Sequence, residues 1–287
     1  MRHLSLFVCA LSLALGLILP HPATAAEKPA GTPLTLGIVP YMSTGMLLRT
    51  HAALAQSLES SLQRPVNLRT APDYKSFFQR LRAGDYDIAI TPPHYGWLAI
   101  RDHGFQPLLV HRDPIRGILV SAADQPVKNI ADLRGASIAV TDRSALMAIL
   151  GAQTLADEGL VENQDYQFVS AVSHSSAIHN AITGKTRAAL VNATSLVLSP
   201  PEIRQRTQVW RDLAVFPGQF YIAHARLGED YKAVIAALQA FERSPAGQEF
   251  FTNTAQGGFR ALTADDRKTL ERALPETRRQ LREADQK

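Results

Sequence analysis

The chain reads Leu34-Thr35-Leu36-Gly37-Ile38-Val39-Pro40-Tyr41 at its first apolar strand pattern, and Tyr86-Asp87-Ile88-Ala89-Ile90-Thr91-Pro92-Pro93-His94-Tyr95 where a similar pattern returns. Between them, Val66 to Tyr74 is a third strand pattern that ends in Ala71-Pro72-Asp73-Tyr74. In open parallel sheets, ligands bind beyond the carboxyl ends of the strands. The sequence therefore predicts a binding crevice at these three ends, with Tyr41, Tyr74 and Tyr95 among its walls.

Strand and helix patterns alternate through most of the chain, which indicates an α/β fold. Residues 47–62 place apolar side chains at three- and four-residue steps, the spacing of a helix with one buried face. A second helix is expected from Tyr74 to Arg82 and ends at Gly84. We therefore expect mostly parallel sheets flanked by helices.

A second series of strands and helices occupies the middle of the chain, between connectors at Pro114 to Gly117 and at Pro217-Gly218. Loop residues of this kind absorb the backbone rotation of a hinge, although proline and glycine are also common in ordinary loops. We expect two lobes joined by two crossover strands. Lobe 1 would comprise residues 34–116 plus 217–287, and lobe 2 would comprise residues 117–216.

Residues 1–25 have the pattern of a cleaved export signal: a basic start, an apolar run from Leu4 to Leu19, and Ala23-Thr24-Ala25. A membrane anchor is the alternative, but the run is short for a bilayer span and Pro20 breaks its end. The only cysteine, Cys9, lies inside this signal. We therefore expect an exported protein whose mature chain has no disulfide and no thiol chemistry.

The charge balance is weakly basic, with 30 Lys and Arg against 26 Asp and Glu and a net charge of +4. Nucleic-acid-binding proteins carry a clustered basic face, whereas the excess here is small and spread along the chain. We expect no nucleic-acid partner. A small anionic ligand is compatible with this balance.

Two predicted helix starts in the middle of the chain carry polar groups. Thr141-Asp142-Arg143-Ser144 offers hydroxyls, helix N–H groups and a guanidinium to an oxyanion or a carboxylate; alternatively, Thr141 or Asp142 only caps the helix and Arg143 points to water. In Ser173-His174, the imidazole can donate to an anion, although a loop histidine is more often a surface or capping residue. Asn192 ends a further strand.

The start of the predicted helix at Asp73-Tyr74 has the same two interpretations. Asp73 is a candidate N-cap, and the Tyr74 hydroxyl can donate to a ligand bound at the helix start. The alternative is a capped helix whose tyrosine packs against its neighbours.

Catalytic motifs are not visible in the sequence. It has no Gly-x-Ser-x-Gly elbow, no His-Glu-x-x-His and no phosphate-binding Gly-rich loop with lysine. The histidines are scattered over different predicted elements, so nothing in their spacing indicates a metal site. We expect no catalytic residues, no metal and no cofactor.

Several motifs, in this order, resemble the phosphate, phosphite and phosphonate-type substrate-binding proteins of ABC importers. They are Leu36-Gly37-Ile38-Val39-Pro40, Ala71-Pro72-Asp73-Tyr74, Leu81 to Ala89, Asp132-Leu133-Arg134-Gly135-Ala136-Ser137-Ile138-Ala139, Ser173-His174 and Gly184-Lys185. The resemblance runs from about Leu34 to Thr263.

The resemblance implies a two-lobed type II periplasmic-binding fold without catalytic activity, which closes on a small anionic or zwitterionic ligand such as a phosphonate. Family ligand positions correspond to Tyr41, Tyr74, Tyr95, Thr141, Ser144 and His174. This chain departs from the family in two places: Asp142-Arg143-Ser144-Ala145 replaces a hydroxyl-rich helix start, and Arg187 stands where many members have an acidic residue. Arg143, Arg187 and His174 are therefore expected to make the second lobe's cleft face positive.

We expect a monomeric solute-binding protein that serves an ABC permease, with Tyr41, Tyr74, Tyr95, Thr141, Arg143, Ser144, His174 and Asn192 as ligand contacts. Two alternatives remain open. The same fold serves as the ligand-sensing subunit of membrane histidine kinases or cyclases, and an exported hydrolase of similar architecture would use His174 as a base. Fold analogy carries much of this functional prediction.

Overall fold

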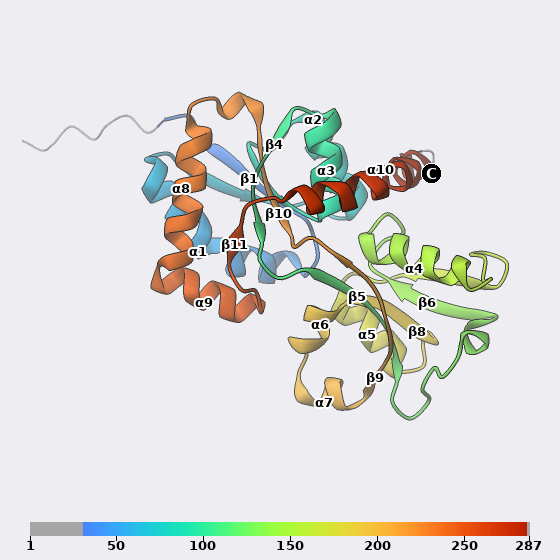
Figure 1. The fold of residues 1–287 in the computed structure, drawn as a ribbon. Helices are drawn as coiled ribbons and strands as arrows, with labels where there is room; N and C mark the ends of the chain where they lie inside the picture. Colours follow the sequence, from blue (N-terminus) through green and yellow to red (C-terminus); the bar gives the residue numbers. More distant parts are fainter. Residues whose placement is uncertain (1–30, 286–287) are drawn as a thin grey trace, which may run out of the picture.

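A computed structural model describes residues 31–285, so the predicted export signal lies outside the described residues. The described part forms two sheets, each flanked by helices (Figure 1). The first sheet has the order β11-β4-β10-β3-β1-β2. Its strands are β1 (Leu34–Ile38), β2 (Val66–Arg69), β3 (Ile88–Thr91), β4 (Phe105–His111), β10 (Phe220–His224) and β11 (Phe259–Arg260).

The second sheet has the order β7-β6-β8-β5-β9. Its strands are β5 (Ile115–Ala122), β6 (Ala136–Val140), β7 (Tyr166–Ser170), β8 (Ala188–Asn192) and β9 (Thr207–Phe216). Both sheets are mixed. In the first, β1 pairs in parallel with β2 and β3 while β10 runs antiparallel to β3 and β4; in the second, β6 pairs in parallel with β7 and β8 while β5 is antiparallel to β8 and β9.

The helices divide between the sheets, and we call each sheet with its helices a lobe. Lobe 1 has α1 (Thr44–Leu62), α2 (Tyr74–Ala83), α3 (Pro93–Asp102), η2 (Ala225–Leu227), α8 (Asp230–Arg243), α9 (Pro245–Thr254) and α10 (Ala264–Asp285). Lobe 2 has η1 (Ile130–Leu133), α4 (Leu146–Asp157), α5 (His174–Ile182), α6 (Ala193–Val197) and α7 (Pro201–Gln205). No helix in residues 31–285 is both long and apolar enough to cross a membrane.

Local sequence explains where the helices near the lobe boundary begin. Asp73 caps α2 by accepting from the Ser76 N–H at 2.6 Å, as its position in the sequence predicts. Ser173 caps α5 in the same way, accepting from the Ser176 N–H at 3.1 Å. Because of this cap, α5 begins at His174, directly after Ser173.

The two connectors between the lobes touch each other. The His111 N–H donates to the Gln219 carbonyl at 2.9 Å. A Cβ at Gly218 would overlap the carbonyl oxygens of His111 and Asp113, so only glycine fits there. The chain thus crosses between the lobes twice at one place, through β5 and β9 (Figure 1).

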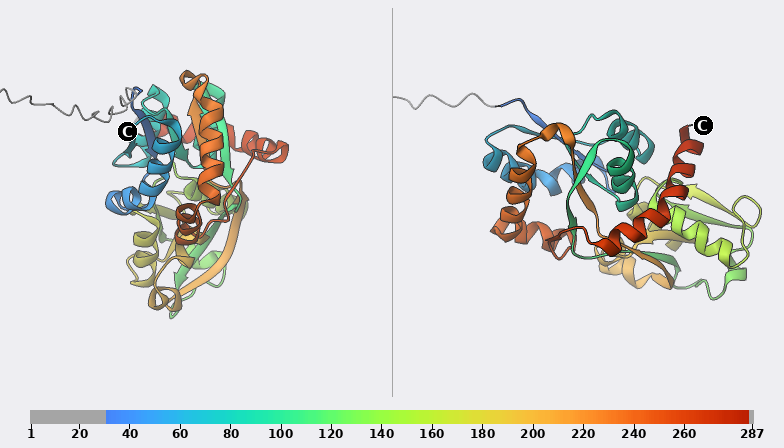
Figure 2. Two further views of the ribbon diagram at one scale, coloured as in Figure 1. Left: turned by 90° about the vertical axis from the view of Figure 1, so that its left-hand side faces the viewer. Right: turned by 45° about the horizontal axis from the view of Figure 1, so that its top comes forward.

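The C-terminal helix α10 lies along the boundary between the lobes. It packs mainly on α3 of lobe 1 and also contacts α4 and β9 of lobe 2. Figure 2 shows it passing beside α4 in the second view. Buried Leu270, Leu274 and Leu281 of α10 belong to the apolar cluster that also contains the start of α4. Helix α10, which is distant in sequence from lobe 2, therefore helps to hold lobe 2 against lobe 1.

Some elements were not expected from the sequence. They are β4, β9, β11, α3, α6, α7 and the two short helices η1 and η2. Strand β9 lies at the edge of its sheet and most of its described side chains are at least partly exposed, so it has little apolar alternation. Helix α3 begins with Pro93 at its first position, which is a helix-start signal; we had interpreted residues 91–95 as the tip of a strand.

Candidate functional site

A cavity of about 370 Å³ lies between the lobes. Lobe 1 supplies residues after β1, in α1, at the start of α2 and in α9, whereas lobe 2 supplies the starts of α4, α5 and α6. A molecule in this cavity therefore contacts both lobes. The volume lies within the usual range for small-molecule sites.

Four of the predicted ligand contacts line this cavity. Tyr41 and Tyr74 do so from lobe 1, and His174 and Asn192 from lobe 2. The structure thus brings together residues from four separate strand ends. Their roles as ligand contacts stay predictions.

The start of α4 presents backbone donors to the cavity. Ala145 is its N-cap and provides no side-chain cap, while Ala145, Leu146 and Met147 all line the cavity. The first N–H groups of a helix have no partner within the helix and lie at its partially positive end. An anionic or strongly polar group can therefore be bound here without a cationic side chain.

His174 and His111 both line this cavity and both have a buried Nδ1 without a hydrogen-bond partner among the described residues; His174 is the one that lobe 2 supplies. The residue is only 8% exposed, and its Nδ1 has no hydrogen-bond partner among the described residues. Burial lowers its pKa to about 4, so the ring is neutral at neutral pH. A buried polar group of this kind costs free energy until a ligand or water pairs with it.

His111 adds a second neutral imidazole to the lining, at the end of β4. Burial, together with the neighbouring His51, lowers its pKa to about 3. Its Nε2 lies 3.2 Å from the Tyr221 hydroxyl, which fixes the ring. Burial also raises the pKa values of Tyr41 and Tyr74, so the hydroxyls of both tyrosines are protonated and uncharged at neutral pH.

Two further predicted contacts, Tyr95 and Ser144, bind each other. The Tyr95 hydroxyl donates to Ser144 Oγ at 2.7 Å, and Ser144 Oγ donates to Asp142 Oδ1 at 2.6 Å. His94 Nε2 lies 3.2 Å from the Ser144 carbonyl oxygen and its ring packs on Tyr95. Neither Tyr95 nor Ser144 lines the cavity; both are buried in a direct contact between the lobes.

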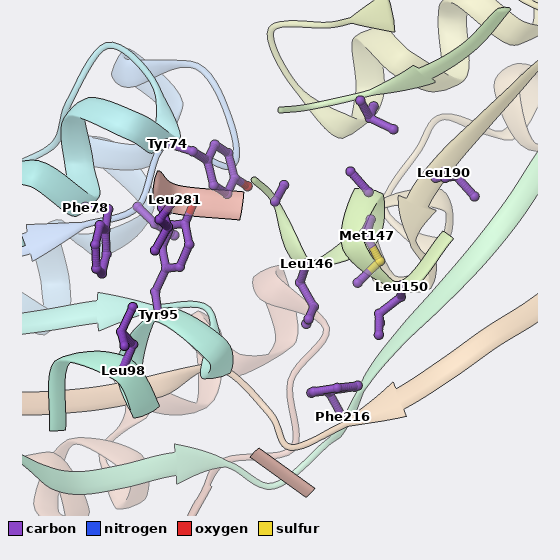
Figure 3. Packing of buried hydrophobic residues seen from close by; sticks show 14 of the residues in the cluster. Tyr74, Phe78, Tyr95, Leu98, Leu146, Met147, Leu150, Leu190, Phe216 and Leu281 are labelled. Carbon is purple, nitrogen blue, oxygen red and sulfur yellow. The ribbon is translucent and has the colours of Figure 1, made fainter. Parts of the chain in front are cut away.

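Figure 3 shows this boundary, with Tyr74 and Tyr95 on one side and Leu146 and Met147 on the other. Leu281 of α10 lies beside Tyr95 in the same view. All five belong to a single apolar cluster.

Thr141 lies in a second, smaller cavity of about 260 Å³, which it shares with Tyr74. Asp73 and Asp142 also line this space, so it is acidic. The Asp142 carboxylate accepts from both the N–H and the hydroxyl of Ser144, at 2.8 and 2.6 Å. The donors just before α4 are thus occupied by the protein's own anion.

Arg143 does not line either cavity. Its Nε lies 2.9 and 2.8 Å from the two carboxylate oxygens of Glu162, and its guanidinium lies over the Phe168 ring. Arg187 is also directed elsewhere, because it donates to the backbone carbonyls of Gln125 and Pro126. With His174 neutral, the expectation of a positive cleft face was wrong; every residue that lines the larger cavity is uncharged at neutral pH.

The sequence analysis missed the lining residues from α1 and α9. Met42 and Met46 lie at the start of α1, and Phe250, Asn253 and Thr254 come from α9. Phe250 is buried and also lines the cavity. The C-terminal part of the chain packs on the N-terminal part, but no local sequence pattern indicates this packing. Only the tertiary structure therefore reveals this wall of the cavity. No three or more His, Cys, Asp or Glu within residues 31–285 are grouped as a metal site.

Comparison with protein families settles what kind of protein this is. Residues 36–267 match the family described as the periplasmic substrate-binding protein of phosphonate ABC transporters. The chain belongs to this phosphonate-binding family. Its members are periplasmic substrate-binding proteins that work with an ABC transporter, as the motifs of the sequence predicted. No curated protein matches the chain.

Solved structures confirm the fold as the two-lobed type II periplasmic-binding type. PhnD1 from Prochlorococcus marinus, solved with methylphosphonate, has a TM-score of 0.74 at 14% identity, covering 87% of this chain and 98% of that one. A binding protein component of an ABC phosphonate transporter from Pseudomonas aeruginosa has a TM-score of 0.73 at 13% identity, covering 88% and 99%. The alkanesulfonate-binding protein SsuA from Xanthomonas axonopodis, bound to MOPS, has a TM-score of 0.58 at 15% identity, covering 88% and 94%.

Proposed function

We propose that this protein is exported by a cleaved signal in residues 1–25 and, as a monomer, captures one small ligand between its lobes for an ABC permease. The cavity lined from both lobes carries this proposal. A ligand that touches both lobes favours the closed arrangement by its difference in affinity for the closed and open states. The protein binds the ligand and does not transform it.

The ligand's polar head is bound by neutral groups. Candidate donors are the first N–H groups of α4, the Tyr74 hydroxyl and the His174 imidazole, which all belong to residues that line the cavity. Helix N-termini bind phosphate, phosphonate, sulfonate and carboxylate groups without a cationic side chain. An organic anion or a zwitterion fits this set of donors.

Closure is proposed to occur by bending at the connectors, with lobe 1 comprising residues 34–116 plus 217–287 and lobe 2 comprising residues 117–216. The contact of Gly218 with the His111 and Asp113 carbonyls supports this assignment, because both crossings lie at one place. Rotation about such a point opens the cavity and leaves each sheet unchanged.

Isothermal titration calorimetry with phosphate, phosphite and phosphonates tests the proposal. We expect one site per chain, with affinity reduced about tenfold or more by Tyr74→Ala and by His174→Ala. His179→Ala is the matched control, because His179 is exposed and lies on the same helix as His174. Unchanged affinity in both cavity variants would place the site elsewhere.

A further inference from the structure

Large apolar side chains from both lobes form part of the cavity wall. Lobe 1 contributes Met42 and Met46, and lobe 2 contributes Leu146, Met147 and Leu198. Leu146 and Met147 are buried at the start of α4, across the lobe boundary from Tyr74 (Figure 3). The apolar wall thus begins next to the backbone donors proposed to bind the ligand's head.

The same wall extends to the mouth of the cavity. Met46 is 48% exposed and Leu198 is 47% exposed, and they belong to α1 of lobe 1 and the end of α6 in lobe 2. Exposed methionine and leucine side chains at a binding cavity leave apolar surface in contact with water. Covering that surface with an apolar group is favourable.

The volume of the cavity also indicates a ligand larger than a small inorganic oxyanion. Water takes about 30 Å³ per molecule in the liquid, so the cavity of about 370 Å³ holds far more than one small oxyanion. Inorganic phosphate or methylphosphonate would leave most of the apolar wall wet. No charged side chain lines the cavity to favour a compact, highly charged ion.

Some of the hydrogen-bond donors next to α4 are already occupied within lobe 2. Asp142 occupies the N–H and hydroxyl of Ser144, the donors just before α4. The anionic head of any ligand is therefore kept away from Ser144 by this carboxylate. The remaining donors lie at the first residues of α4, next to Leu146 and Met147.

We infer that the ligand is an organic acid with an apolar body of several carbons, whose head binds at the start of α4 and whose body lies along the Met46 and Leu198 wall. This inference rests on the proposed function and specifies its substrate class. Selectivity then comes from the apolar body and not from the charge of the head.

The test is a series of straight-chain alkylphosphonates, from methyl to hexyl, titrated by calorimetry beside inorganic phosphate. Each buried methylene is expected to tighten the dissociation constant about fourfold. Equal affinity along the series, or tightest binding of phosphate or methylphosphonate, would overturn the inference and leave the proposed function intact. Absence of binding by every compound, short and long, would overturn both.

Two variants locate the apolar body. Met46→Gln and Leu198→Gln are each expected to weaken hexylphosphonate several-fold while leaving methylphosphonate affinity unchanged, because the two side chains contact only the body. Val161→Gln is the matched control, since Val161 is 47% exposed on lobe 2 and does not line the cavity. Equal loss for the short and long compounds, or no loss for either, would contradict this placement.

Discussion

The Tyr95 hydroxyl of lobe 1 lies 2.7 Å from Ser144 Oγ of lobe 2. Both side chains are buried, so this hydrogen bond joins the lobes away from solvent. It continues to Asp142, which accepts from Ser144. The protein therefore has a direct contact that holds the lobes in this arrangement in addition to any ligand.

Tyr95→Phe is expected to weaken closure by about 1–3 kcal/mol, because it removes this hydrogen bond and leaves the Ser144 hydroxyl with one partner fewer. Small-angle scattering of the ligand-free protein should show a larger radius of gyration, and ligand affinity should fall about tenfold or less. Tyr86→Phe is the control, since it makes the same chemical change inside lobe 1. Identical scattering of wild type and Tyr95→Phe would exclude a role in closure.

Arg143 is expected to stabilise lobe 2 and not to bind the ligand. Arg143→Gln breaks its pair with Glu162, so the free energy of unfolding should fall by about 1–3 kcal/mol in urea. Affinity for the tightest ligand should be unchanged. Arg116→Gln, in an exposed pair with Asp212, should cost at most about 1 kcal/mol. A tenfold loss of ligand affinity in Arg143→Gln would contradict this prediction and show that the guanidinium binds the ligand.

Acidification is expected to destabilise the protein between pH 6.5 and about 4. His51, His94 and His174 are buried, and burial lowers the pKa of each to about 4; burial lowers the pKa of His111 to about 3. The unfolded chain therefore binds more protons in this range. Their contribution to stability is complete above pH 6.5 and is lost as the pH falls, at on the order of 3 kcal/mol each. Urea unfolding at several pH values measures it.

His174→Asn should reduce the pH dependence by the share of that one ring, whereas the exposed His179→Asn should leave it unchanged. Equal free energies of unfolding at pH 7 and pH 4.5 in the wild type would contradict the burial of these rings in neutral form.

Leu281→Ala is expected to destabilise the protein by about 2–3 kcal/mol, because it removes a buried side chain from the cluster at the lobe boundary. Thermal unfolding should show a lower midpoint, and the exposed Arg282→Ala should stay close to wild type. An unchanged midpoint in Leu281→Ala would mean that the end of α10 is not docked in solution.

The sequence predicted best the elements that carry strong periodicity. Helix α2 was expected from Tyr74 to Arg82 and spans Tyr74–Ala83, and the helix expected over residues 47–62 lies within α1. The caps at Asp73 and Ser173 show how short polar signals refine a helix start. In contrast, β9 and α3 escaped prediction because an exposed edge strand and a helix rich in Pro, His and Gly have weak patterns.

The site was predictable in outline but not in chemistry. Tyr74 and His174 meet at one cavity because strand ends of both sheets face the lobe boundary. Whether Arg143 faces that boundary depends on its pairing with Glu162, 19 positions away in the chain, and residue type alone does not encode that choice. The wall from α9 depends on the return of the C-terminal block to lobe 1, which has no local signature.

A crystal structure with the tightest-binding member of the alkylphosphonate series tests the central claim most directly. We expect the compound between the lobes, with its head within hydrogen-bond distance of Tyr74 or the first N–H groups of α4 and of His174, and its chain against Met46 and Leu198. A compound bound on the outside of one lobe, with the space between the lobes filled by side chains, would contradict the account.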